Sequence, residues 1–253
     1  MKKVFKYIHL FFSLLMAENG FFEKGVAFYD ARSDGAVGYD VKPYPIENAI
    51  KQLKKASSNS DLDAGVYLMR SYYFKGKFLA KTDDEKKKVF SKGKKLGEIL
   101  VERYLGSAAA RYWFSVNLGS WAEVYGTMAA AKEGVAGLMK NHAEKIIEID
   151  PNYSNGGGYF MLGAVHFKSP YIPFILSWPS NDLAIKNLKK AYSIGDPTPS
   201  QIVYLAQALF KDGQKDKAKS QLRELLKKPL SRKEKVEDFD QHEIAKILLK
   251  DWE

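Results

Sequence analysis

The sequence predicts an all-α protein, an array of stacked helical hairpins, from three observations. Apolar residues recur at steps of three and four along most of the chain, which places them on one stripe of each helix. No convincing alternation of apolar and polar residues, the pattern of a half-buried strand, is present. Prolines, which end helices, fall between the amphipathic stretches at Pro151, Pro170, Pro197 and Pro229.

The composition is that of a folded protein without cysteine chemistry. The chain has 253 residues, of which 45% are apolar and 28% charged, and its formal net charge is +10. It is too apolar for an intrinsically disordered chain, and it is long enough to bury a large core. The absence of cysteine excludes disulfides, zinc–thiolate sites, iron–sulfur clusters, a cysteine nucleophile and an acylated cysteine anchor.

The hairpins follow the spacing of the tetratricopeptide repeat (TPR), a helix–turn–helix unit of about 34 residues. Its first helix carries a leucine and a small residue flanked by large residues. Its second helix has small, large and small residues at steps of four and three. Two units match in full, with Tyr159, Leu162, Gly163, His166, Ala184, Leu188 and Ala191 in one, and Leu205, Ala206, Leu209, Ala218, Leu222 and Leu225 in the other.

We therefore expect one domain, residues 18–253, folded as a TPR-like helical hairpin array (an α-solenoid) with a C-terminal capping helix. An ordinary helical bundle is the alternative. A partial unit begins at Gly25, and residues 34–46 are expected to form a long loop inside it. The expected helices cover 18–34, 45–57, 62–77, 84–105, 107–127, 132–149, 156–168, 181–194, 199–212, 215–227 and 232–251.

Residues 1–17 differ from the rest of the chain. Three lysines (Lys2, Lys3 and Lys6) precede a short apolar run over 10–17 that ends in a small residue. This pattern is typical of a secretory signal peptide, and the run is shorter than the ~20 residues that span a bilayer. We expect a signal peptide here and no membrane-spanning segment elsewhere. The alternative is an amphipathic first helix of the fold, in which case the protein is cytoplasmic.

Four motifs between Ala109 and Lys228 carry a family resemblance. They are RYWFSVNLGSW at 111–121, EIDPNYSNGGGYFMLG at 148–163, a proline-rich insert ending in WPSN at 178–181, and AIKNLKKA at 184–191. Together they resemble the T-component family of the tripartite ATP-independent periplasmic (TRAP) transporters, whose members are TPR-like helical proteins. Microtubule-associated TPR-like proteins are more distant relatives of this type.

The resemblance implies a non-enzymatic periplasmic protein. Its partner would be the substrate-binding subunit of a TRAP-type transporter, and a hydrophobic small ligand would occupy a bore through the helices. The chain has no cysteine after the signal, so it departs from the lipoprotein members and favours a soluble form without a lipid anchor. The alternative is a general TPR scaffold for peptides or proteins, unrelated to transport.

The candidate binding residues are large aromatic and polar side chains near these motifs. The apolar insert over 171–179 exceeds the few residues that a TPR turn needs, so it is expected to be a lid over a ligand channel, a partner contact or a hydrophobic plug. The aromatic residues outside the insert lie near the core by spacing, where a structural role competes with binding. The candidates are Tyr112, Trp113, Asn117, Trp121, Tyr159, His166, Phe174 and Trp178.

No catalytic residue, metal site or cofactor is predicted. The histidines lack metal-ligand spacing, and His166 is expected to be a packed core residue. No Gly-x-Ser-x-Gly elbow supports a nucleophilic serine. Residues 156–158, three glycines before a helix, offer backbone N–H groups to an anion, but close helix packing is the favoured interpretation.

The basic excess is densest between Lys75 and Arg103, where ten basic residues stand against five acidic ones. A solvated helix face is the expected interpretation, and attraction to an anionic membrane surface or an acidic partner is the alternative. Nucleic acid is not an expected partner, because the run lacks interleaved arginines and aromatics on a known module.

Overall fold

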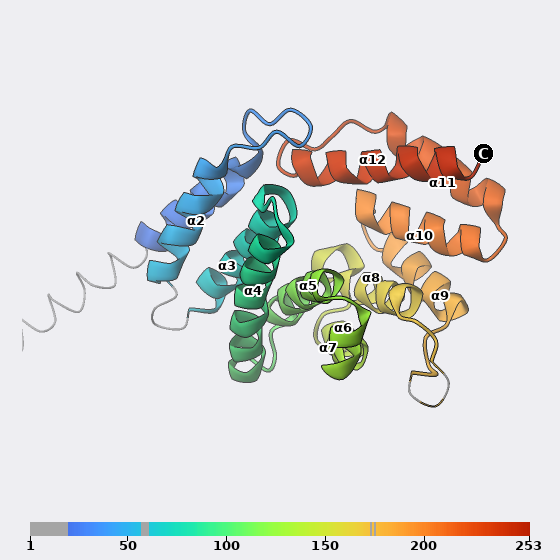
Figure 1. Ribbon diagram of the computed structural model, residues 1–253, viewed down its shortest axis with the longest axis horizontal. Helices are drawn as coiled ribbons and strands as arrows, with labels where there is room; N and C mark the ends of the chain where they lie inside the picture. Colours follow the sequence, from blue (N-terminus) through green and yellow to red (C-terminus); the bar gives the residue numbers. More distant parts are fainter. Residues whose placement is uncertain (1–19, 57–60, 173, 175) are drawn as a thin grey trace, which may run out of the picture.

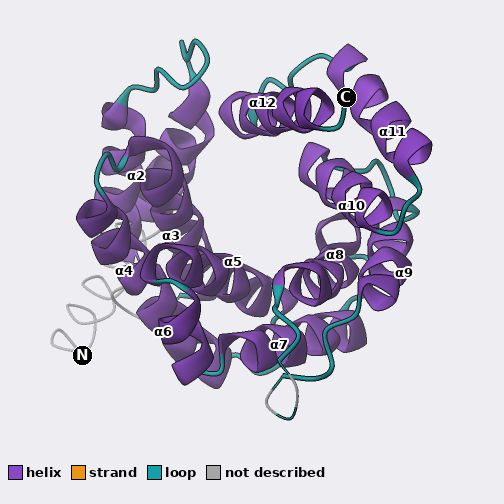
Figure 2. Cartoon of the chain, turned by 45° about the vertical axis from the view of Figure 1, so that its right-hand side comes forward, coloured by secondary structure: helices purple, strands orange, loops and turns teal. Residues whose placement is uncertain are grey.

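The protein is an all-α array, as predicted. The computed structural model describes residues 20–56, 61–172, 174 and 176–253, and the expected signal segment 1–17 lies outside them. Within these residues the chain is helical, with two isolated β-bridges and no strand. Successive hairpins stack side by side and curve into a ring (Figures 1 and 2).

Each predicted helix has a counterpart. A helix over 20–30 leads into a short 3₁₀ turn, η1 (Ala31–Ser33). The elements that follow are α2 (Pro43–Ala56), α3 (Leu62–Phe74), the π-helical turn η3 (Lys75–Leu79), α4 (Asp83–Arg103), α5 (Ala108–Tyr125), α6 (Thr127–Lys132), α7 (Val135–Ile149), α8 (Tyr153–Lys168), α9 (Asn181–Tyr192), α10 (Pro199–Lys211), α11 (Lys215–Lys227) and α12 (Lys235–Asp251).

Two expectations about local structure were wrong. The loop expected over 34–46 ends earlier, because α2 begins at Pro43, and proline suits the first turn of a helix. The short helix α6 was not expected, since its six residues are too few to show a helical period. It lies between Gly126 and Gly134, whose φ angles of 89° and 63° allow the sharp turns at its ends.

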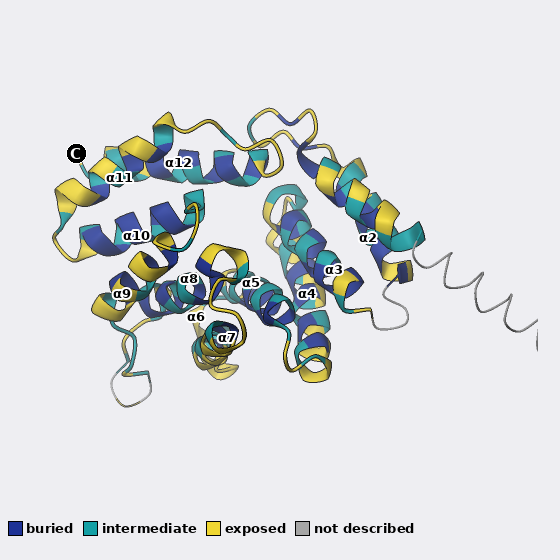
Figure 3. Ribbon diagram, turned by 180° about the vertical axis from the view of Figure 1, so that it is seen from behind, coloured by how far each residue is buried: buried dark blue, intermediate teal, exposed yellow. Residues whose placement is uncertain are grey.

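Small residues let paired helices approach closely, as the repeat spacing predicts. A Cβ atom added to Gly163 of α8 would lie 2.6 Å from Leu188 Cγ of α9 and 3.1 Å from the Ala184 carbonyl oxygen. Ala184, Leu188 and Ala191 are fully buried. The stripe of small residues therefore holds each hairpin together, and Figure 3 shows the exposed residues gathered on the outer faces of the helices.

The glycine cluster near the start of α8 serves packing. Gly156, Gly157 and Gly158 are all buried. A Cβ atom on Gly158 would lie 2.8 Å from Ile147 Cγ1, and one on Gly157 would lie 2.7 Å from Tyr112 Cε2. Gly158 brings α8 against α7, Gly157 brings it against α5, and Gly156 lies against Ala191 at the end of α9. This agrees with the favoured interpretation of the sequence.

The last helix closes the array into a ring in addition to capping α10 and α11. Val236 of α12 is fully buried in the same apolar cluster as Tyr29 and Phe74, which belong to the first hairpins. The Arg32 side chain, only 2% exposed, donates from Nε to Glu237 Oε1 at 2.8 Å. These interactions join parts of the chain about 200 residues apart, and we call them the closure contact.

Further bonds strengthen the closure contact. Lys235 Nζ donates to the Ala36 carbonyl oxygen at 2.7 Å, and the Tyr39 hydroxyl donates to Asp240 Oδ1 at 3.0 Å. Burial and the nearby Asp240 carboxylate raise the pKa of Tyr39 to about 12, so this phenol keeps its proton at neutral pH. The loop after η1 thus packs against α12 through both apolar and polar contacts.

We expect His142, on α7, to make the protein sensitive to acid. Burial, followed by the positive charge of Arg111, lowers the pKa of His142 to about 4. In the unfolded chain its pKa is about 6.5, so the unfolded state binds more protons between the two values. The contribution to stability is full above pH 6.5 and is lost as the pH falls through 4, by about 3 kcal/mol.

Urea unfolding at several pH values measures this effect. Glutamine at position 142 keeps an acceptor for Arg111 Nη1, which lies 3.1 Å from His142 Nδ1 in the wild type. The difference in unfolding free energy between wild type and His142→Gln should be constant above pH 7 and shrink toward pH 4. A constant difference over the whole range would contradict the assignment.

Candidate functional site

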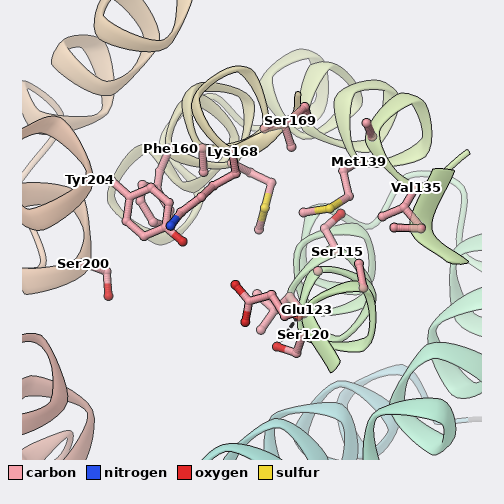
Figure 4. Close-up of a pocket in the computed structure, with 18 of the residues that line it drawn as sticks. Ser115, Ser120, Glu123, Val135, Met139, Phe160, Lys168, Ser169, Ser200 and Tyr204 are labelled. Atoms are coloured by element: carbon pink, nitrogen blue, oxygen red, sulfur yellow. Dashed lines mark hydrogen bonds between the residues drawn. The ribbon is translucent and has the colours of Figure 1, made fainter. Parts of the chain in front are cut away.

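The inner face of the ring carries a cavity of about 1030 Å³ that is partly open to solvent. Side chains from the helix over 20–30, α3, α5, α6, α7, α8, α10 and α12 line it, so nearly every unit of the array contributes. Figure 4 shows labelled side chains of α5, α7, α8 and α10 around it. A volume of this size is at the upper end for small-molecule pockets.

One wall, formed by α7, α8 and α10, is mainly apolar. Phe160 and Tyr204 pack edge to face with their ring centroids 5.3 Å apart, and Met139 and Val135 continue the surface (Figure 4). Burial raises the pKa of Tyr204, so this phenol stays protonated. Lys168 Nζ lies 5.4 Å from the Tyr204 ring centroid and brings one positive charge to the edge of the apolar wall.

Another wall is mainly polar and is supplied by α12 together with the residue before it. Glu234, Glu237, Asp238 and Gln241 all line the cavity. Burial raises the pKa of Glu237, while the adjacent Arg32 acts in the other direction. One oxygen of Glu237, Oε2, is buried without a hydrogen-bond partner. This wall therefore offers a polar end to a molecule whose body lies against α8 and α10.

A half-buried guanidinium lies among aromatic rings next to the cavity. Arg70 of α3 stacks on Tyr29, Tyr67 and Trp113, with its Cζ 4.7, 4.8 and 5.1 Å from the three ring centroids. Its Nε atom has no hydrogen-bond partner, and no carboxylate of the described residues pairs with it. The phenol and indole faces stabilise the positive charge of Arg70. No feature of the local sequence distinguishes Arg70 from other arginines.

The proline-rich insert lies at the rim of the cavity. Ile172 and Leu176 bond to each other through their backbones at 2.9 and 2.7 Å, which makes a tight loop, and both line the cavity. Trp178 also lines it and packs edge to face on His166 at 5.1 Å. Phe174 points outward, is fully exposed and has a φ of 65°. The insert therefore contributes one face to the cavity and leaves one aromatic ring in solvent.

Three of the predicted site residues line the cavity, namely Tyr112, Trp113 and Trp178. The others lie elsewhere. Asn117 is fully buried and donates from Nδ2 to the Met69 and Trp113 carbonyl oxygens at 3.1 and 2.9 Å. It joins α3 to α5, which is a structural role.

The other predicted residues that do not reach the cavity lie in packing positions or in solvent. Trp121 is buried and stacks on Tyr125 at 4.4 Å. Tyr159 is half-buried, with Lys190 Nζ 5.9 Å from its ring centroid. His166 is buried and supports Trp178 from behind, and burial lowers its pKa.

Sequence reasoning missed most of the polar lining. Glu123, Lys168, Tyr204 and Gln207 were not singled out, although all four line the cavity. Tyr204 immediately precedes the Leu205–Ala206 pair of a predicted first helix, and first helices face the inside of a TPR array. The position of Tyr204 in the repeat could therefore have indicated that it faces the cavity. Nothing in the sequence of α12 itself indicates that its residues line the cavity.

Among the residues that the structure describes, no group of three or more histidine, aspartate or glutamate side chains is placed to hold a metal ion. No helix in the described part of the chain combines the length and apolar character needed to cross a membrane.

Comparisons with known proteins agree with the fold and give a family. The crystal structure of TTC0263, a thermophilic TPR protein of Thermus thermophilus, is similar with a TM-score of 0.61. The similarity covers 93% of this chain and 98% of that chain at 16% identity, which shows a shared TPR-like fold. A search of curated protein sequences found no match. Residues 38–175, more than half of the 253, match the model of regulator of microtubule dynamics protein 1-3, so the chain belongs to that family.

Proposed function

We propose that the protein is a non-enzymatic binding protein that holds a hydrophobic small ligand inside the ring and presents it to a protein partner. The central cavity, bordered by α12, is the observation that carries this proposal. Its apolar wall at Phe160 and Tyr204 provides burial for the body of a ligand, and burial of apolar surface is the main source of affinity in such pockets. The polar wall at α12 favours a ligand with one polar end.

An experiment that fills the cavity tests this proposal. Ala164 and Ser120 line the cavity from α8 and α5, and both are half-buried. Tryptophan at both positions should reduce binding of the apolar fluorescent probe N-phenyl-1-naphthylamine about tenfold or more, since the indoles occupy the space. Ile99 and Leu183 are 46% and 41% exposed, and tryptophan at both of these positions is the matched control.

The outcome is read by fluorescence titration and by mass spectrometry of molecules that co-purify with each variant. We expect saturable binding in the wild type and the control and a loss in the filled variant. Equal binding in all three proteins would contradict a ligand inside the ring.

The proposal also includes a specific protein partner. The resemblance of residues 109–228 supports the substrate-binding subunit of a TRAP-type transporter, in the periplasm and without a lipid anchor. The mass of the mature N-terminus in a producing cell tests export, because an intact Met1 would contradict it. Affinity capture before and after Phe174→Ala, at the exposed tip of the insert, tests the contact with the partner.

A general scaffold is the second candidate function. The family description names regulation of microtubule dynamics, and α4 carries three exposed lysines, Lys88, Lys92 and Lys95, on one side of the helix. None of them forms an ion pair with the described residues. Co-sedimentation with microtubules that is lost in the triple lysine-to-glutamate variant would favour this function. The same change at the exposed Lys211, Lys215 and Lys227 is the control.

A further inference from the structure

The Arg70 guanidinium is a positive charge on the inner side of the array that lacks a counter-charge. None of the ion pairs among the described residues includes Arg70, and its Nε atom is buried without a hydrogen-bond partner. The rings of Tyr29, Tyr67 and Trp113 pack around the guanidinium. Its N–H groups lie in the plane of the guanidinium, where they can bind a carboxylate through two parallel hydrogen bonds.

The phenols near Arg70 do not neutralise its charge. Burial raises the pKa of Tyr29 and of Tyr153, while Arg70, and for Tyr29 also Arg32, acts in the other direction. Both phenols therefore keep their protons at neutral pH, and a protonated phenol can donate to an anion. We call Arg70 together with Tyr29, Tyr67, Trp113 and Tyr153 the Arg70 cage.

A strained turn at the start of α8 positions one side of the Arg70 cage. Ser154 and Asn155 have φ angles of 51° and 54°, in the left-handed region that residues with a Cβ atom rarely adopt. Gln201, only 1% exposed, donates from Nε2 to the Asn155 carbonyl oxygen at 2.7 Å and helps to hold the turn. The turn sets Tyr153 against Tyr112, with ring centroids 5.6 Å apart, and places Ser154 on the cavity lining. Backbone strain of this kind is concentrated at binding sites.

The Arg70 cage adjoins the central cavity. Arg70 is half-buried and lies one turn before Tyr73 on the same face of α3, and Tyr73 lines the cavity. Tyr29 and Trp113, which pack against Arg70, line it as well. The Trp113 ring lies 6.2 Å from the Tyr73 ring, so an aliphatic chain that leaves the cage meets aromatic surface at once.

The charges on the α12 wall already have partners, in contrast to Arg70. Glu237 accepts from Arg32 Nε at 2.8 Å, and Asp238 accepts from the Ser231 backbone N–H at 2.8 Å. A cationic ligand would compete with Arg32 for Glu237. An anionic ligand would supply the counter-charge that Arg70 lacks, and the α12 carboxylates would repel it toward the cage.

We propose that the Arg70 cage binds the carboxylate of an apolar carboxylic acid whose tail lies in the central cavity. This inference rests on the proposed function and names the class of its ligand. The two carboxylate oxygens accept from N–H groups of Arg70, and the rings of the cage shield this pair from water. The tail passes Trp113 and Tyr73 toward the apolar wall.

Three probes with the same tail test the head group on the full chain. Octanoate, octan-1-ol and octylammonium are titrated up to about 2 mM, and calorimetry gives each affinity. The NMR signal of the Arg70 Nε–H group reports contact with the head group in the wild type, so this measurement needs no substitution. Displacement of N-phenyl-1-naphthylamine reports separately on the tail in the cavity.

Matched variants isolate Arg70. Octanoate should bind the wild type about tenfold or more tighter than octan-1-ol, and Arg70→Gln should remove this difference while octan-1-ol still binds. Arg103→Gln removes the same charge at an exposed position of α4 outside the cavity lining. Lys168→Gln removes a cation that lines the cavity. These two variants should keep the difference within about twofold.

A saturable shift of the Arg70 signal with octanoate, together with a preference for octanoate that only Arg70→Gln removes, supports the proposal. The proposal is overturned if octan-1-ol or octylammonium binds as tightly as octanoate, or if octanoate leaves the Arg70 signal unchanged. It is also overturned if the preference survives in Arg70→Gln or is lost in Lys168→Gln. Failure of the proposed function looks different, because then neither octan-1-ol nor N-phenyl-1-naphthylamine binds.

Discussion

Replacing Leu188 with alanine is expected to lower the free energy of unfolding by about 3–4 kcal/mol. Leu188 is fully buried on α9 and packs where Gly163 of α8 lacks a side chain. Removing its three outer carbons loses apolar burial and leaves a cavity between the two helices. Urea unfolding followed by circular dichroism measures the change. Leu183→Ala, on the same helix but 41% exposed, should change stability by less than about 0.5 kcal/mol.

A double-mutant cycle shows whether the close approach of α8 and α9 is the cause. Gly163→Ala alone should destabilise the protein by about 1–3 kcal/mol, because the new Cβ atom would overlap Leu188 Cγ. With Leu188→Ala present, the added methyl group enters vacated space. The double variant should therefore be more stable than the sum of the single effects predicts, and strict additivity would contradict this packing.

Replacing Glu237 with alanine should open the ring and lower the free energy of unfolding by about 2–4 kcal/mol. The change leaves the Arg32 guanidinium buried with its main counter-charge gone, since Glu234 Oε1 is 4.0 Å away on a half-exposed side chain. Glu243→Ala removes a carboxylate of the same helix that pairs with Lys246 at the surface, and it should cost about 1 kcal/mol or less.

Opening of the ring can be measured directly because the chain has no cysteine. Single cysteines placed at the exposed Asp34 and Lys233 accept spin labels across the closure contact. We expect a longer and broader distance distribution in Glu237→Ala than in Glu243→Ala. Arg32→Met in the Glu237→Ala background should recover part of the lost stability, because it removes the unpaired charge. An unchanged distance distribution would show that other contacts close the ring.

The sequence predicted the hairpins because their packing is local. Gly163 and Leu188 lie on adjacent helices within one repeat, so the spacing of small and large residues carries their contact. The closure contact could not be predicted in this way. Arg32 and Glu237 lie 205 positions apart, and nothing in the local pattern around either residue indicates that they meet.

The candidate site was predicted only in part, for a related reason. A helix in this array buries one face against its neighbours and turns another toward the cavity, and periodicity alone does not tell the two apart. Trp113 lines the cavity, whereas Asn117, one turn later, is fully buried against α3 and α4. Lining residues such as Glu237 depend on the curvature of the whole array, which sets where α12 lies.

The bridging position of α12 changes how this solenoid should unfold. A linear repeat protein is stabilised by neighbouring units only, so its terminal repeats fray first and independently. Here the two terminal units share one apolar cluster through Val236 and protect each other. The contact also raises the mean sequence separation of interacting residues, which slows the last step of folding relative to an open array. Amide exchange in α2 and α12 should consequently follow a single cooperative opening, in which both ends of the chain are released together.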